Sequence, residues 1–330
     1  MIPATQESIR AFVPTTPFTE PHTLILATGV TIVLVLASAI GLGLKLTVAK
    51  RQPHGGIDNL NTRVTAWWAI AVIVGLALLA GRAGVILLFA FASWVALREF
   101  AAPAPGRRGE RALFLACACT ALPLQYFFVA RGSLIAYTLF IPVFALLAVP
   151  LAAARLCGPR AADERTANMQ RGLALCVWGI AHVPALLALE IPGYEGRNAF
   201  LLVFFLLVVQ ASDVLQYLWG KFAGRRPIAP RLSPSKTVEG LVGGVACATA
   251  LGAVLSPITP FSALEAAIIS LVITLLGFAG GLLLSASKRR RGIKDWGTLI
   301  RGHGGMLDRL DSVCLSAPVF LHIVRVGWAG

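Results

Sequence analysis

The chain has 330 residues, of which 57% are hydrophobic and 13% are charged, and its mean hydropathy is +0.78. Soluble globular domains carry about 25% charged residues, so this composition excludes an ordinary soluble protein and indicates a polytopic membrane protein. The formal net charge of +14 would favour nucleic-acid binding in a soluble chain. No nucleic-acid-binding motif accompanies that charge, and we expect no nucleic-acid partner.

Ten apolar segments follow a polar N-terminal tail (residues 1–23) and predict an all-α bundle of about ten transmembrane helices. We treat residues 24–330 as one transmembrane domain, with its catalytic part at about 198–328, because no loop is long enough to fold alone. The expected spans are residues 24–48, 64–80, 84–97, 112–129, 134–154, 172–189, 198–219, 238–255, 264–284 and 312–328.

Two stretches of this pattern are expected to be irregular. Residues 84–97 are fewer than the roughly 20 needed to cross a bilayer, so we expect this segment to be tilted or partly re-entrant. Residues 155–171 are polar, and we expect them to serve only as a connector between two spans.

The basic residues are distributed unevenly between alternate loops. With ten spans, 24 of the 29 lysines and arginines fall on one side of the membrane and 5 on the other. Basic loops remain in the cytoplasm, so the richer side is expected to be cytoplasmic. We therefore expect an integral protein of a bacterial-type inner (plasma) membrane, with its active site on the cytoplasmic face.

The most polar run of the chain, residues 285–311, predicts a binding site for a nucleoside triphosphate. Asp308 and Asp311 are three residues apart, which places both carboxylates on one face if a helix begins near Leu307. Carboxylates this close favour a cation between them, and Mg²⁺ commonly binds one or two carboxylates plus phosphate oxygens. Gly304 and Gly305 supply a backbone that can adopt positive φ and approach an anion closely.

A second polar cluster lies around the end of the 198–219 span. Asp213 falls inside or at the end of that span, where a carboxylate indicates function or, alternatively, an ion pair with Lys221 or Lys236. The run Ser233-Pro234-Ser235-Lys236-Thr237 supplies hydroxyls, amides and an ammonium group suited to phosphate. It leads into the 238–255 span, whose N-terminus also favours an anion. Glu239 could cap that helix or contact a metal, and Gly243 and Gly244 would let the helix pack closely against a neighbour.

Together these clusters resemble the signature of the phosphatidate cytidylyltransferases, also called CDP-diacylglycerol synthases. The matching positions are Ser285, Lys288, Arg289, Lys294, Asp295, Gly297, Ile300, His303, Gly304, Gly305, Asp308, Arg309 and Asp311, with Asp213, Tyr217, Ser233, Pro234, Lys236, Thr237, Glu239 and Gly240 in the second cluster. The sequence departs from the family pattern at Gln216, Ser235, Val238, Ser287 and Arg301. These departures suggest a divergent branch of the family.

The resemblance implies transfer of CMP from CTP to phosphatidic acid, or to a related lipid phosphate, with release of pyrophosphate. We expect Mg²⁺ as one or two cations. The expected partners are CTP, phosphatidic acid or another lipid phosphate, membrane lipids, and a second copy of the chain in a homodimer. The catalytic candidates are Asp295, Asp308, Lys294 and Lys236. The metal candidates are Asp213, Asp295, Asp308 and Asp311. The substrate-binding candidates are Ser233, Lys236, Thr237, Arg289, Lys294, His303, Gly304, Gly305 and Arg309.

Two other functions compete with this interpretation. A CTP-dependent kinase of a polyprenol or another lipid alcohol would move the γ-phosphate and release CDP. A transporter of a phosphorylated solute would place charges near the middle of the membrane and use discontinuous helices. The observed clustering of charge at one face of the predicted bundle favours the nucleotidyltransferase.

Overall fold

The computed structural model describes residues 21–48, 52, 55–102, 108–299 and 304–329, and these form two compact units. The first unit extends through Val85 and the second begins at Ile86. Of the polar tail predicted at residues 1–23, all but the last three residues lie outside the described part. The predicted site residue His303 also lies outside it.

The first unit is a hairpin of two long helices, α2 (Pro21–Thr47) and α3 (Gly55–Leu79). An ion pair between Lys45 and Asp58 joins the two helices near their connection. Deeper in the hairpin, the indole Nε1 of Trp68 donates a hydrogen bond of 3.1 Å to the hydroxyl of Ser38. Polar contacts therefore reinforce a pair of helices whose surfaces are otherwise largely apolar.

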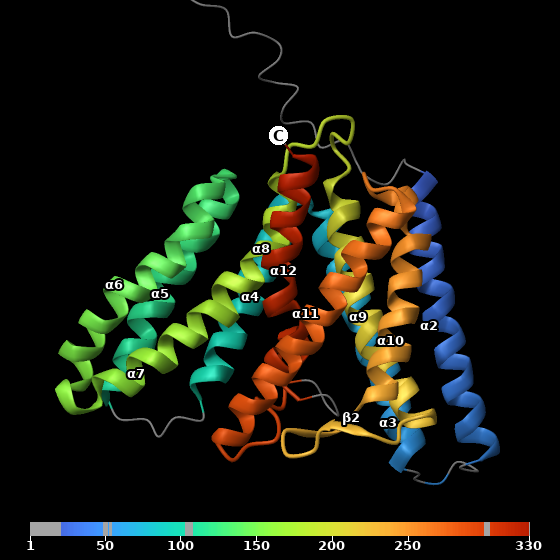
Figure 1. The fold of residues 1–330 in the computed structure, drawn as a ribbon, viewed down its shortest axis with the longest axis horizontal. Helices are drawn as coiled ribbons and strands as arrows, with labels where there is room; N and C mark the ends of the chain where they lie inside the picture. The colour runs from blue at the N-terminus through green and yellow to red at the C-terminus, as the bar shows by residue number, and fades with distance from the viewer. Residues whose placement is uncertain (1–20, 49–51, 53–54, 103–107, 300–303, 330) are drawn as a thin grey trace, which may run out of the picture. The chain divides into compact units, whose positions relative to one another are not determined.

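The second unit holds the remaining helices and a small hairpin (Figure 1). Most of α4 belongs to it. In chain order its elements are α4 (Gly81–Ala101), α5 (Arg108–Arg131), α6 (Leu134–Cys157), α7 (Pro159–Gly172), the π-helix η2 (Leu173–Gly179), α8 (Ile180–Ala185), the 3₁₀-helix η3 (Leu186–Ala188), α9 (Asn198–Phe222), β1 (Pro227–Ala229), β2 (Ser233–Thr237), α10 (Val238–Val254), the 3₁₀-helix η4 (Ser256–Ile258), α11 (Ala263–Arg290) and α12 (Leu307–Trp328).

The helical bundle expected from the sequence is confirmed. Among the described residues, nine helices are long and apolar enough to cross a membrane, and α10 is a shorter apolar helix of 17 residues. Each of the ten predicted segments overlaps one of these ten. The structure thus contains a polytopic all-α membrane protein.

The structure corrects the expected re-entrant segment and the expected connector. The third segment is the 21-residue helix α4, because the helix continues beyond the apolar run into Arg98, Glu99 and Phe100. Residues 155–171 are largely helical as well, since Pro159 stands at the start of α7, where a missing amide costs nothing. An ion pair from Arg165 of α7 to Glu110 of α5 then anchors this polar helix.

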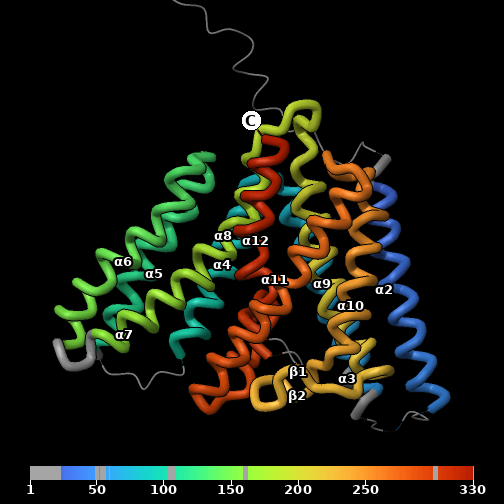
Figure 2. The backbone as a smooth tube through the Cα atoms, in the orientation of Figure 1, coloured from blue at the N-terminus to red at the C-terminus, as the bar shows by residue number. Residues whose placement is uncertain are grey.

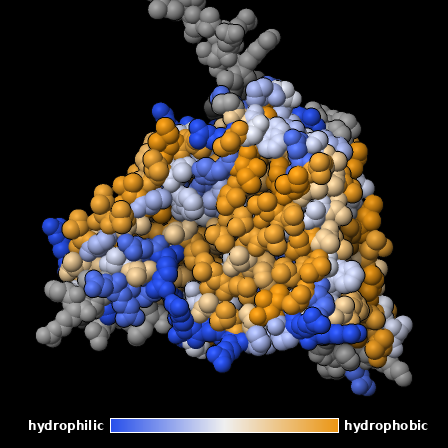
Figure 3. Space-filling view, in the orientation of Figure 1, coloured by the Kyte–Doolittle hydropathy of each residue, from blue (hydrophilic) through white to orange (hydrophobic). Residues whose placement is uncertain are grey.

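Helix α12 occupies the centre of the second unit and contacts α9, α11, α8 and η2 (Figure 1). Its apolar core includes Phe320, which stacks on Phe205 of α9 at a centroid distance of 5.2 Å. Hydrophobic residues cover the face over α9–α12, whereas hydrophilic residues gather along the lower rim (Figure 3). The β1–β2 hairpin turns at that rim beside the end of α11 (Figure 2).

Helices α9 and α10 pack closely because α10 presents glycines to α9, as the sequence indicated. A Cβ atom added at Gly244 would lie 2.5 Å from the backbone nitrogen of Gln216, and one added at Gly243 would lie 2.5 Å from the Trp219 ring. Helix–helix association in membranes depends on such small residues, because lipid already surrounds apolar side chains favourably.

This packing predicts that Gly244→Ala lowers the stability of the bundle, because the new methyl group must displace the backbone of α9. Overpacking of this kind costs about 1–3 kcal/mol. Thermal unfolding in detergent, followed by loss of the monodisperse peak in size-exclusion chromatography, measures the effect. The matched control is Gly327→Ala, since no atom lies within 4 Å of the added Cβ there. Equal unfolding midpoints for the two variants would contradict the packing argument.

Candidate active site

The site is centred on the hydroxyl of Ser312, in the second turn of α12. Its Oγ donates a hydrogen bond of 2.7 Å to Oδ2 of Asp213 on α9 and lies 3.3 Å from Oδ1 of Asp311. The backbone amide of Ser312 also donates to Oδ1 of Asp311 at 2.8 Å. Asp213 on α9 and Asp311 on α12 therefore both lie at the Ser312 hydroxyl, although Asp213 precedes Ser312 by 99 residues in the sequence. We call these two aspartates the carboxylate pair.

The carboxylate pair lies well inside the bundle. Asp213 precedes the end of α9 at Phe222 by nine residues, which is about 14 Å at a rise of 1.5 Å per residue. On α11, Gly281 lies beside the Asp311 carboxylate and precedes the helix end at Arg290 by the same number of residues. Charged groups at such depth in a membrane protein are costly unless cations accompany them.

Lys236 reaches this depth from the β hairpin. Its Nζ lies 4.6 Å from the centroid of the Phe278 ring on α11. A Cβ added at Gly281 would lie 2.7 Å from that Nζ and 3.5 Å from Oδ2 of Asp311. The absence of a side chain at Gly281 thus leaves the space in which the lysine approaches the carboxylate pair, and Lys236 interacts electrostatically with both aspartates.

Arg309 is a second cation at the carboxylate pair. It lies in the first turn of α12 and interacts electrostatically with Asp213 and Asp311. Its Nε is buried and has no hydrogen-bond partner among the described residues. An arginine with a buried, unused Nε donor is suited to bind a phosphate oxygen.

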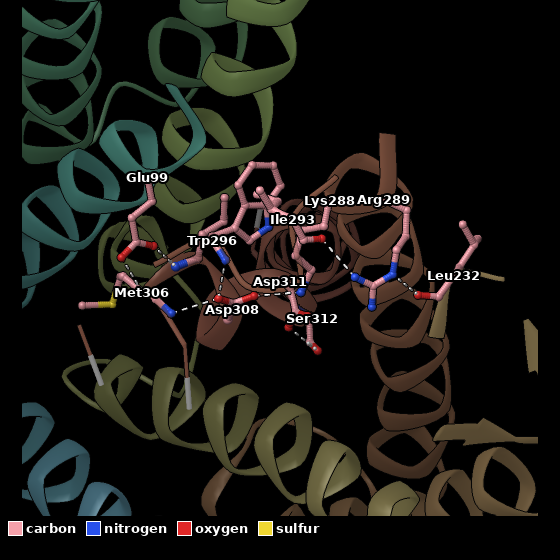
Figure 4. Close-up of polar contacts among 12 residues, drawn as sticks. Glu99, Leu232, Lys288, Arg289, Ile293, Trp296, Met306, Asp308, Asp311 and Ser312 are labelled. Carbon is pink, nitrogen blue, oxygen red and sulfur yellow. Dashed lines mark hydrogen bonds and ion pairs between the residues drawn. The ribbon is translucent and has the colours of Figure 1, made fainter. Parts of the chain in front are cut away.

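Asp308, another acid of the polar run, is fully engaged by protein groups (Figure 4). Its Oδ1 accepts a hydrogen bond of 2.8 Å from Nζ of Lys288 on α11. Its Oδ2 accepts from the backbone amides of Trp296 and Gly305, at 2.8 and 2.9 Å. The predicted start of a helix at Leu307 is confirmed, and Asp308 ties that start to α11 and to the loop between the helices.

A glutamate from α4 completes the start of α12. Glu99 is 6% exposed and accepts hydrogen bonds from the amides of Met306 and Leu307, both at 2.9 Å. The predicted positive φ at Gly304 is present, at 83°, and an added Cβ there would lie 2.5 Å from Oδ2 of Asp308. Gly304 and Gly305 thus lie close to two carboxylates of the chain, those of Asp308 and Glu99.

The other predicted residues are more peripheral. Arg289 donates to the carbonyl oxygens of Leu232 and Ile293, at 3.1 and 3.0 Å, and so links the hairpin to the end of α11. Thr237 caps α10, because its Oγ1 accepts a hydrogen bond of 3.1 Å from the Gly240 amide. Lys294 and Asp295 are exposed on the loop after α11, and Ser233 begins β2.

Glu239 accepts hydrogen bonds from the amides of Arg225 and Arg226, at 2.9 and 3.1 Å, and so holds the turn after α9. Glu239 therefore does not cap α10, which was one of its two expected roles, because Thr237 is the capping residue.

The candidate site residues did not include Ser312, Lys288 or Glu99, although Lys288 is one of the positions that match the family signature. Ser312 directly follows Asp311, and Lys288 belongs to the basic run, so both carried a weak signal through their neighbours. Glu99 lies more than 200 residues before the amides it binds, and only its place at the end of an apolar segment distinguished it. The tertiary fold alone brings it to the site.

Comparison with known proteins identifies the family of the chain. Residues 61–326 match the cytidylyltransferase family. The chain is 32% identical over 293 residues to the uncharacterized protein YnbB of Escherichia coli (strain K12), covering 88% of this chain and 95% of YnbB.

Two enzymes are similar over a shorter stretch. The chain is 34% identical over 145 residues to the phosphatidate cytidylyltransferase of Aquifex aeolicus, and 36% identical over 149 residues to that of Staphylococcus saprophyticus. Each match covers 44% of this chain, and the chain spans 54% and 56% of the two enzymes, about half of their length. The match over residues 61–326 includes the carboxylate pair, Lys236, Lys288 and Glu99, and the chain belongs to the cytidylyltransferase family.

Proposed function

We propose that this membrane nucleotidyltransferase transfers CMP from CTP to phosphatidic acid or a related lipid phosphate, giving a CDP-lipid and pyrophosphate. The observation that carries the proposal is the meeting of Asp213 and Asp311 at the Ser312 hydroxyl, with Lys236 and Arg309 beside them. The similar phosphatidate cytidylyltransferases supply the substrate class.

The chemistry needs positioning and charge neutralisation more than a strong base. An oxygen of the lipid phosphate forms a bond to the α-phosphorus of CTP, while the bond from that phosphorus to the β-phosphate oxygen breaks. Pyrophosphate leaves with the electron pair. Because the nucleophile is already an anion, repulsion between two anions is the main obstacle. Lys236 and Arg309 are placed to take up this charge in a site where water is scarce.

The oxygen donors at the centre fit Mg²⁺. Among the described residues, no group of three or more histidine, cysteine or acidic side chains could hold a metal ion. Mg²⁺ does not require such a group, since it commonly takes one or two carboxylates and completes its shell with phosphate oxygens and water. Asp213, Asp311 and the Ser312 hydroxyl would hold it, and the ion would screen the phosphates. Asp295 and Asp308 remain predictions as further ligands.

The arrangement also supports an active site on the cytoplasmic face. Lys236 reaches the site from the hairpin, and Arg289 links that hairpin to the end of α11, so both elements lie at the same rim of the unit (Figure 2). That rim holds loops assigned to the basic side by the sequence, which is the cytoplasmic side under the positive-inside rule. A lipid phosphate would then enter sideways between helices from the inner leaflet.

Identifying the second product tests the proposed reaction. Purified protein is incubated with CTP labelled at the α-phosphorus, Mg²⁺ and vesicles containing phosphatidic acid. We expect label in the lipid fraction and one pyrophosphate released per labelled lipid. Release of CDP with an unlabelled lipid would instead identify a CTP-dependent kinase. Absence of both products across a panel of lipid phosphates would overturn the proposal.

The carboxylate pair should be essential for that reaction. Asp213→Asn and Asp311→Asn each remove a negative charge that would hold the cation and keep the overall shape of the side chain. Loss of a preorganised electrostatic group of this kind costs about 100- to 1,000-fold in kcat. The assay is product formation at saturating CTP and lipid, with the amount of folded protein measured by size-exclusion chromatography.

Asp163→Asn is the matched control for these two variants, because Asp163 is exposed on α7. It should retain the turnover of the unsubstituted protein. If Asp311→Asn turned over as fast as Asp163→Asn, the carboxylate pair would have no part in the mechanism.

A further inference from the structure

The N-terminus of α12 is held by a side chain from a distant helix. Both oxygens of Glu99 accept backbone hydrogen bonds, Oε1 from the Met306 amide and Oε2 from the Leu307 amide, each at 2.9 Å (Figure 4). The first amides of a helix have no partner within the helix and need an acceptor. Met306, the residue before the helix, provides no capping side chain, so Glu99 takes this role.

Two glycines of the neighbouring loop leave the space that the Glu99 carboxylate occupies. A Cβ added at Gly305 would lie 2.3 Å from Oε2 of Glu99, and one added at Gly297 would lie 2.7 Å from Oε1. Two glycines from the loop between α11 and α12 therefore enclose the Glu99 carboxylate. Its negative charge also interacts favourably with the N-terminal end of the α12 dipole.

The next residue of α4 holds the other end of the same loop. The Phe100 ring stacks on Trp296 at a centroid distance of 5.1 Å, and the Arg291 guanidinium lies 4.2 Å from the Phe100 ring centroid. Arg291 also donates a hydrogen bond to the Phe100 carbonyl oxygen. Consecutive residues of α4 thus contact both the beginning of the loop and the start of α12.

These contacts determine where the chain can bind an anion. Glu99 occupies the amides of Met306 and Leu307, and Asp308 occupies the amides of Trp296 and Gly305. These four amides are therefore already paired with carboxylates, and the cationic groups beside the carboxylate pair are Arg309 in the first turn of α12 and Lys236 on the β hairpin.

We propose that Glu99 is a positioning residue for nucleotidyl transfer: by holding the first turn of α12 it sets where Asp311 and Ser312 meet Asp213. The expected effect on kcat rests on the proposed function, whereas the role of Glu99 in holding the first turn of α12 does not. Both carboxylate oxygens of Glu99 accept hydrogen bonds from backbone amides, which suits a positioning role.

Glu99→Gln tests the proposal with the full-length protein. The amide group of glutamine places a donor where the structure has an acceptor, so one of the two backbone hydrogen bonds is lost. Hydrogen bonds to a charged group contribute enough that we expect kcat to fall roughly 10- to 100-fold, with smaller changes in the KM values for CTP and phosphatidic acid. In hydrogen–deuterium exchange, peptides spanning residues 304–310 should exchange faster than in the unsubstituted protein.

Glu110→Gln is the matched control, since Glu110 is also a shielded glutamate but pairs with Arg165 between α5 and α7. It removes an ion pair and should lower the unfolding midpoint without changing kcat or the exchange of residues 304–310. A second variant, Gly305→Ala, keeps the glutamate at position 99, but the added methyl group displaces its carboxylate. It should reproduce the slow turnover and fast exchange of Glu99→Gln, and it remains informative if Glu99→Gln does not fold.

The outcomes separate the two proposals. Normal exchange and normal kcat in Glu99→Gln would overturn the positioning role, as would an equal loss of kcat in Glu110→Gln. If the unsubstituted protein forms no CDP-lipid, the proposed function fails. Even then, faster exchange at residues 304–310 in Glu99→Gln but not in Glu110→Gln would support the role of Glu99 in holding the first turn of α12. Unchanged exchange in Glu99→Gln would overturn that role.

Discussion

The site depends on one shared hydroxyl, that of Ser312, which joins the carboxylates of two helices deep in the bundle. Two acids at this depth repel each other, and neither is stable there without cations. Close packing of α11 brings a cation to these acids. A Cβ added at Gly280 would lie 2.5 Å from the Asp311 carbonyl oxygen, and the missing side chain at Gly281 leaves space for Lys236. Small residues on α11 thus let α12 and a hairpin lysine converge on one point, and a divalent cation would complete the balance of charge.

The start of α12 reverses the usual use of a helix N-terminus. Glycine-rich turns before a helix commonly bind phosphate through free amides. Here Glu99 accepts the amides of Met306 and Leu307, Asp308 accepts the Gly305 amide, and Gly304 and Gly305 make room for those carboxylates. Anion binding then falls to side chains. Such an arrangement keeps the loop rigid before a substrate arrives, which is the condition for a site that works by positioning charges.

Much of this could be predicted from the sequence because the strongest signals are local. Apolar runs gave ten helices, spacing placed Asp308 and Asp311 on a helix beginning at Leu307, and glycines in the 238–255 span indicated close packing. What failed was non-local or depended on context. Most of residues 155–171 lie in α7, where Arg165 pairs with Glu110 of α5, and no pattern revealed that Glu99 would cap a helix more than 200 residues away. The Gly305 amide, expected to be free for phosphate, is paired because the Asp308 carboxylate three residues further on accepts its hydrogen bond.

A double-mutant cycle on turnover tests the central claim most directly, namely that Asp213 and Asp311 act as a unit across α9 and α12. Turnover is measured for Asp213→Asn, Asp311→Asn and the double variant under saturating CTP, Mg²⁺ and phosphatidic acid. Residues that serve one function show strongly non-additive losses. The account predicts that the double variant is about as slow as the slower single variant. Losses that multiply, as for two independent sites, would contradict it.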